Sequence, residues 1–101
     1  VLADLIESAK SLNIPPVADA GDDITIHSDE DGKATVLLDG SRSYDPDGRV
    51  SEWLWVDRDG KEIGQTPQLR ARISKGVHNF TLFVTDDGGA ESSANITIQV
   101  R

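Results

Sequence analysis

Apolar and polar residues alternate most clearly in two stretches of the chain, residues 78–85 and 95–100. Every second residue in them is apolar, and successive side chains of an extended strand point to opposite faces of a sheet. The residues on the apolar faces are Phe80, Leu82 and Val84 in the first stretch and Ile96, Ile98 and Val100 in the second. Both stretches are therefore predicted to be strands that turn one face towards a hydrophobic core.

Short extended runs, separated by glycine, aspartate and proline, fill most of the chain after Pro16. Acidic and glycine residues at 29–32, 57–60 and 87–89 suit tight turns because they tolerate positive φ angles. The predicted strands are residues 17–20, 23–27, 34–39, 50–56, 68–73, 78–85 and 93–100. Seven short strands with turns at this spacing predict an all-β fold, a β-sandwich of two sheets.

Residues 1–12 follow a different pattern, with apolar residues at roughly helical spacing and charged residues between them. The apolar positions are Leu2, Leu5, Ile6, Ala9 and Leu12. A helix of about three turns is marginal by itself, so this segment is predicted to be a short amphipathic helix or a linker from a preceding region. Pro15 and Pro16 then end the pattern. We therefore place a domain boundary between residues 1–12 and a β-sandwich domain at residues 13–101.

The composition limits the function classes that remain. The 101 residues provide enough chain for one domain, and a hydrophobic fraction of 37% is too high for a disordered chain. The net charge of -8 opposes binding to nucleic acids and to anionic membrane surfaces. The sequence has no cysteine and no apolar run long enough to cross a bilayer. We expect a monomer without nucleic-acid or membrane partners.

Several short motifs occur in a fixed order along the chain. Residues 13–21 read N-I-P-P-V-A-D-A-G, residues 38–48 read L-D-G-S-R-S-Y-D-P-D-G, and residues 83–90 read F-V-T-D-D-G-G-A. Trp55 follows the second motif, and Gly76 opens the strand that leads to the third. This ordered series covers roughly residues 13–101 and resembles the PKD (polycystic kidney disease) domain.

The resemblance implies an Ig-like β-sandwich that occurs as a module of secreted and cell-surface multidomain proteins. It therefore implies a non-catalytic extracellular accessory module, acting as a spacer or a protein-interaction domain, whose partners are neighbouring domains or an extracellular protein. One stretch departs from the family pattern. Many members follow the core tryptophan with a Phe-Gly-Asp-Gly turn, whereas here Trp55 is followed by residues 56–60, V-D-R-D-G. No role is carried over to this hairpin.

The resemblance also implies a calcium site, because some PKD domains bind calcium through residues at matching places. The implied ligands here are Asn13, Asp45, Asp47 and Asp86, with Asp87 as the next choice. Calcium takes six to eight oxygen ligands, so carboxylate and amide oxygens from several segments would have to converge. The alternative is that these aspartates only form turns and bond to nearby backbone amides. Both interpretations stay open from the sequence.

Trp53 and Trp55 are two residues apart, so in a strand they share a face. Large aromatic side chains usually fill the interior of a small sandwich, which makes core packing the first interpretation. If both rings were exposed they could stack on sugar rings, which would make the chain a carbohydrate- or fibre-binding module of a secreted hydrolase. Trp53 and Trp55 are therefore candidate ligand-binding residues, with a polysaccharide as the alternative partner.

Catalysis has little support in the sequence. The chain has no Gly-x-Ser-x-Gly elbow, no His-Glu-x-x-His motif and no glycine-rich phosphate loop. Its two histidines, His27 and His78, lie in predicted strands. We therefore expect no catalytic residues and no enzymatic activity.

Two tripeptides fit the pattern for N-glycosylation and begin at Asn79 and Asn95. Both asparagines lie in predicted strands, on the face opposite the apolar residues Phe80 and Ile96. Such short patterns also arise by chance, so the sequence does not decide whether either asparagine carries a glycan.

Overall fold

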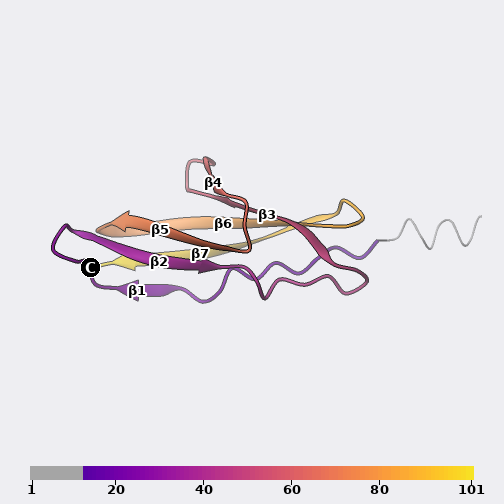
Figure 1. Cartoon of the computed structure of the whole chain (residues 1–101), viewed down its shortest axis with the longest axis horizontal. Helices are drawn as coiled ribbons and strands as arrows, with labels where there is room; N and C mark the ends of the chain where they lie inside the picture. The colour runs from indigo at the N-terminus through magenta and orange to yellow at the C-terminus, as the bar shows by residue number, and fades with distance from the viewer. Residues whose placement is uncertain (1–12) are drawn as a thin grey trace, which may run out of the picture.

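Seven β-strands form two sheets in the computed structural model, which describes residues 13–101 (Figure 1). The strands are β1 (Ile24–Ile26), β2 (Lys33–Asp39), β3 (Val50–Val56), β4 (Glu62–Gly64), β5 (Gln68–Ser74), β6 (Gly76–Asp86) and β7 (Glu91–Val100). One sheet has five strands in the order β1-β7-β6-β3-β4, and the other pairs β2 with β5. All pairs are antiparallel except β1 with β7. The predicted all-β sandwich is confirmed, whereas the helix predicted at residues 1–12 lies outside the described residues.

Six of the seven predicted strands are present, and the strand predicted at residues 17–20 is wrong. Only Val17 pairs there, through a single antiparallel bridge to Tyr44. Two of the backbone amides that follow Val17 bond to side chains and not to a neighbouring strand. The amide of Asp19 donates to Ser43 Oγ, and the amide of Gly21 donates to Asp19 Oδ1. The seventh strand is instead β4, a three-residue segment too short to show alternation.

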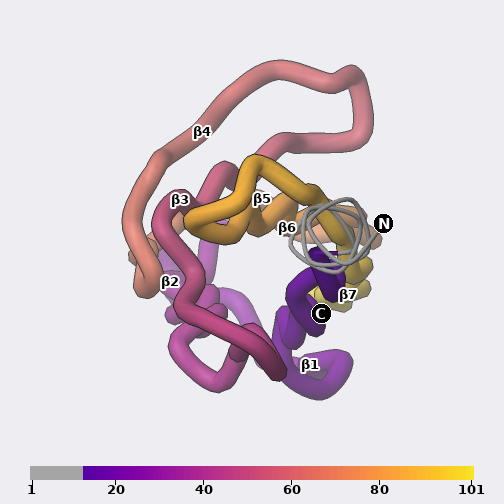
Figure 2. Tube along the Cα trace, turned by 90° about the vertical axis from the view of Figure 1, so that its right-hand side faces the viewer, coloured from indigo at the N-terminus to yellow at the C-terminus, as the bar shows by residue number. Residues whose placement is uncertain are grey.

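The core lies between the two sheets, and the alternation along β6 and β7 supplies much of it. Figure 2 views the strands end-on and shows them arranged around the region that these side chains fill. The largest fully buried hydrophobic residues are Leu38, Trp55, Leu82, Val84, Ile96 and Ile98. Gly40 allows close approach at one point, since a Cβ atom there would lie 2.5 Å from Leu82 Cδ2.

Three turns of the chain share one local structure. In each, an aspartate Oδ1 accepts hydrogen bonds from the amides two and four residues later, and a glycine three residues later has positive φ. The aspartate and glycine pairs are Asp29 with Gly32, Asp57 with Gly60 and Asp86 with Gly89. The predicted turns at these places are confirmed. The hairpin after Trp55, which departs from the family pattern, uses this same turn.

The first of these turns gains an ion pair, which makes its stability depend on pH. The amide of Lys33 and the guanidinium of Arg72, 2.8 Å from Asp29 Oδ2, hold the pKa of Asp29 below its ordinary value of 3.8. A carboxyl whose pKa is lowered by folding stabilises the fold above its unfolded pKa, and that contribution is lost as the pH falls through the folded pKa. We expect Asp29→Asn to be less stable than the natural protein at neutral pH, with the difference vanishing in acid.

Urea denaturation of both proteins between about pH 7 and pH 3 measures this difference. Asp57→Asn is the matched control, because Asp57 forms the same turn without an arginine partner among residues 13–101. A difference for Asp29→Asn that stays constant with pH would contradict the prediction.

The two ends of the described chain lie at opposite ends of the sandwich (Figure 1). At the C-terminal end, the amide of Arg101 donates to the carbonyl of Ile26 at 2.9 Å, and the amide of Ser28 donates to the carbonyl of Arg101 at 2.7 Å. Residues 13–101 contain no helix long and apolar enough to cross a membrane. The described chain therefore enters the sandwich at one end and leaves it at the other.

Candidate functional site

Three carboxylates converge at the end of the sandwich where the chain enters at Asn13. Asp45 comes from the loop between β2 and β3, Asp86 ends β6, and Asp87 begins the turn to β7. One oxygen from each of the three lies within 4.8 Å of the others. The structure thus brings together three of the five residues predicted as calcium ligands, from segments about 40 residues apart.

Asp45 is the residue that turn chemistry does not explain. It is 9% exposed, and both of its carboxylate oxygens are buried without any hydrogen-bond partner. Burial raises the pKa of Asp45, the neighbouring carboxylates of Asp47 and Asp86 raise it further, and the backbone amide of Asp47 offsets part of this rise. A buried carboxylate without a partner is costly. This site would become favourable if a proton or a cation occupied the space beside Asp45.

Asp86, in contrast, makes the backbone hydrogen bonds of a turn residue. It is 2% exposed, and its Oδ1 accepts hydrogen bonds from the amides of Gly88 and Ala90 at 3.0 and 2.8 Å. Its Oδ2 accepts a bond from Asn13 Nδ2 at 2.7 Å. The turn interpretation is confirmed for Asp86. Each carboxylate oxygen has two lone pairs, so Oδ2 keeps one for a further ligand.

Asn13 and Asp47 attach the incoming chain to this cluster. Asn13 reaches it through its bond to Asp86, and the amide of Ile14 donates to Asp47 Oδ2 at 2.9 Å. Asp47 is exposed and lies close enough to Asp45 to raise the pKa of that carboxyl. Two consecutive residues at the start of the domain are therefore bonded to two different acidic segments.

Gly48 is a site residue that the sequence analysis missed. A Cβ atom at this position would lie 2.5 Å from Asp87 Oδ1 and 2.9 Å from Asp45 Oδ2. Glycine therefore leaves a space between two carboxylates that any side chain would fill. The sequence indicates only that Gly48 belongs to an Asp-Gly turn. It does not show that Gly48 lies next to Asp87, because Asp87 is 39 residues away along the chain.

The cluster contains negative charge without a balancing side chain. Arg72 forms the salt bridges found within residues 13–101, and its partners are Asp29 and Asp31 rather than any carboxylate of this site. Oxygens that bind calcium lie about 2.3–2.6 Å from the ion, so two ligands on opposite sides of it are about 5 Å apart. The spacing within 4.8 Å of Asp45, Asp86 and Asp87 meets this requirement. The donor set therefore fits a calcium ion.

The two tryptophans do not form an exposed platform. Trp55 is 0% exposed and its Nε1 donates to the carbonyl of Thr66 at 3.0 Å. Trp53 is half-buried against the core, and its Nε1 donates to the carbonyl of Gly40 at 3.0 Å. Core packing is confirmed for Trp55, and a ligand-binding surface made of both rings is wrong.

The histidines also occupy ordinary structural positions. His27 is exposed, and His78 is half-buried, with Nε2 2.7 Å from the carbonyl oxygen of Ser74. The ring of His78 stacks on Phe80, with 6.3 Å between the ring centroids. Neither histidine is placed beside the carboxylates described above.

Comparison with known proteins connects this fold to one family. The family model described as PKD domain matches residues 13–100. The Dyslexia-associated protein KIAA0319 homolog of Rattus norvegicus is 34% identical over 99 residues, which cover 90% of this chain and 9% of that protein. Low-density lipoprotein receptor-related protein 11 of Homo sapiens is 34% identical over 91 residues, which cover 85% of this chain and 18% of that protein.

A solved structure of a PKD domain has the same fold as this chain. The PKD1 domain of Vibrio anguillarum Epp superposes with a TM-score of 0.66 at 25% identity, covering 88% of this chain and 99% of that domain. The likeness therefore extends over one complete domain of this kind, whereas the chain spans less than a fifth of the two relatives above.

Proposed function

The chain belongs to the PKD domain family, and from that premise we propose that it is a non-catalytic extracellular accessory module, a spacer or interaction domain stabilised by calcium. The relatives support the first part, because the matched region is a small share of much longer proteins. The observation that carries the second part is the carboxylate of Asp45, which is buried and has no hydrogen-bond partner.

The placement of the chain ends supports a spacer. Asn13 is bonded at one end of the sandwich and Arg101 at the other, so neighbouring domains would attach at opposite ends. Both attachments use backbone or buried groups, which limits bending where the chain enters and leaves. A module of this kind sets the distance and orientation between the domains on either side of it.

Calcium would strengthen the attachment where the chain enters. Asp45, Asp86 and Asp87 would supply carboxylate oxygens, and Asn13 and Asp47 would contribute from the incoming segment and the neighbouring loop. A bound cation would remove the repulsion among these carboxylates. Because Asp86 already holds Asn13, neutralising the cluster would also hold the incoming segment in one orientation.

Isothermal titration calorimetry with calcium tests this proposal. The natural protein and the variant Gly48→Ala are both treated with a chelator and then titrated with calcium. The added methyl group would occupy the space between Asp87 and Asp45, so we expect calcium affinity to fall by about tenfold or more. The φ angle of Gly48 is not positive, so alanine adds no backbone strain, but the side chains of Asp87 and Asp45 must move away from the new Cβ atom. The melting temperature of the metal-free variant measures the cost of that movement separately from the loss of calcium affinity.

Magnesium serves as the ion control, since it requires a smaller and more regular ligand shell. A natural protein that takes up no calcium would refute the metal proposal. Equal affinity in Gly48→Ala would place the ion elsewhere on the domain.

A further inference from the structure

We propose that the outer face of the five-stranded sheet binds the outer face of the two-stranded sheet of a second copy of this chain. The contact would place an arginine of one copy between two glutamates of the other. It uses none of the residues of the calcium site, so it goes beyond the function proposed above and can be tested separately. The argument rests on the shape and charge of two faces of the same domain.

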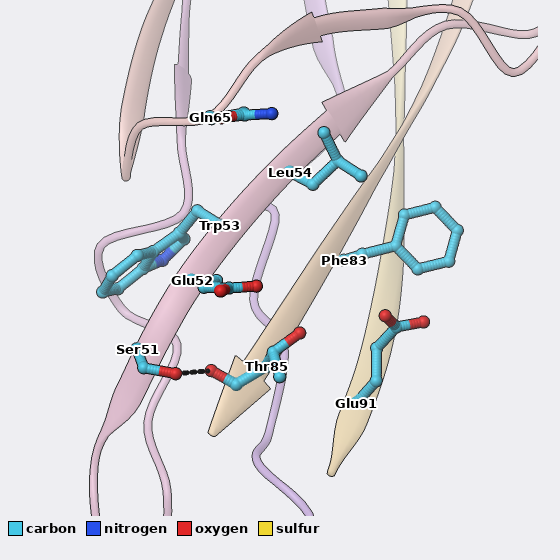
Figure 3. A pocket seen from close by; sticks show the side chains of 8 residues that line it. All are labelled: Ser51, Glu52, Trp53, Leu54, Gln65, Phe83, Thr85 and Glu91. Carbon is cyan, nitrogen blue, oxygen red and sulfur yellow. Dashed lines mark hydrogen bonds between the residues drawn. The ribbon is translucent and has the colours of Figure 1, made fainter. Parts of the chain in front are cut away.

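The first face is a groove of about 340 Å³ across β3, β6 and β7. Strand register defines two rows of side chains in it, because Glu52 pairs with Thr85 and Thr85 with Glu91, while Leu54 pairs with Phe83. Figure 3 shows Leu54 and Phe83 projecting to the same side of the sheet, away from Trp53. The groove thus has an apolar row beside a row that ends in two exposed carboxylates.

The charge of this face is entirely of one sign. The strands β3, β6 and β7 contain no lysine and no arginine, so no basic residue on them neutralises Glu52 or Glu91. Neighbouring strands are about 4.8 Å apart, which places the two glutamates roughly 10 Å from each other across Thr85. This separation accommodates a guanidinium group between two carboxylates, with its aliphatic stem on the apolar row.

The second face, on β2 and β5, carries an apolar side chain beside a basic one. Leu37 is 47% exposed, and its direct partner across the strands is Arg70, which is also exposed. Arg70 forms no salt bridge with any of residues 13–101, whereas the next arginine, Arg72, is bound to Asp29 and Asp31. An apolar side chain beside an unpaired arginine therefore projects from this sheet.

The charged and apolar side chains of the two faces are arranged so that both kinds can meet at the same time. Directly paired residues lie about 5 Å apart, so Arg70 of one copy can lie between Glu52 and Glu91 while Leu37 contacts Leu54 and Phe83. Because the two patches differ, the contact is heterologous: in a pair, one copy keeps a free groove and the other keeps a free face on β2 and β5. Few side chains take part, so the association is weak and the dilute protein remains a monomer.

Sedimentation equilibrium at low ionic strength, from about 20 µM to 1 mM protein, tests the proposal. The natural protein should show an average mass that rises with concentration and falls with added salt. Glu52→Lys with Glu91→Lys in one variant, and Arg70→Glu in another, should each weaken self-association by roughly tenfold. The double lysine variant has less net negative charge, so a general charge effect would change association in the opposite direction.

Mixing the two variants distinguishes this contact from any other. The Arg70→Glu protein keeps an intact groove and the double lysine protein keeps an intact Leu37 and Arg70, so the mixture should associate more strongly than either variant alone. All three changes in one chain should restore self-association. The proposal is overturned if the natural protein stays monomeric up to 1 mM, or if the mixture fails to associate. Calcium or a chelator should change neither result, which separates this test from that of the metal site.

Discussion

About 1 mM calcium is expected to raise the melting temperature of this protein by about 5 °C or more, and Asp45→Asn should remove most of that rise. An affinity on the order of 100 µM, at the tight end of the range for extracellular modules, gives about 1.4 kcal/mol of stabilisation at 1 mM if calcium binds the folded state alone. Each kcal/mol moves the melting temperature of a domain of this size by about 4–8 °C. Differential scanning calorimetry with calcium and with a chelator measures both effects.

The same variant separates a metal site from turn chemistry. Asparagine keeps the shape of Asp45 and removes its charge, so without calcium Asp45→Asn should be at least as stable as the natural protein. Asp59→Asn is the control, because it removes one exposed charge from a turn at a distance from the site. A loss of stability in Asp45→Asn without calcium, together with an unchanged response to calcium, would show that Asp45 has a structural role instead.

Replacing Trp55 with alanine is expected to destabilise the fold by about 3–5 kcal/mol, the largest effect of any single substitution considered. The indole is 0% exposed, packs between the sheets and donates to the carbonyl of Thr66. Its removal leaves a cavity and an unpaired carbonyl. Domains of this kind have only about 5–15 kcal/mol of total stability.

Urea denaturation measures the loss as a lower midpoint with an unchanged slope. Trp53→Ala is the matched control, because Trp53 lies two residues away on the same strand and is only half-buried. Its loss should be clearly smaller. Equal losses in the two variants would contradict the assignment of Trp55 as the centre of the core.

Periodicity predicted the sheets well where strands are long and one face is buried. The alternation of Phe80, Leu82 and Val84 appears unchanged as the buried face of β6. Prediction failed where side chains or tertiary pairing decide the backbone. Asp19 and Ser43 engage donors that a strand at residues 17–20 would need, and β4 forms only because it pairs with β3.

The candidate site was predictable only through the resemblance to the PKD domain. The sequence shows many aspartates, and nothing in their spacing distinguishes Asp45 from Asp57 or Asp29. The structure separates them, because Asp29, Asp57 and Asp86 each bind two amides of their own turn. Asp45 has no such partners and is buried.

The sequence by itself determined the longer strands, the turns and the family of this protein, because these depend on residues close together along the chain. Only the tertiary structure decided that Asp45, Asp86 and Asp87 meet, that Gly48 leaves space between two of them, and that Trp55 is inaccessible to a ligand. The physical reason is that convergence and burial depend on how distant segments pack. Local pattern carries no information about the neighbours that the fold brings to each side chain.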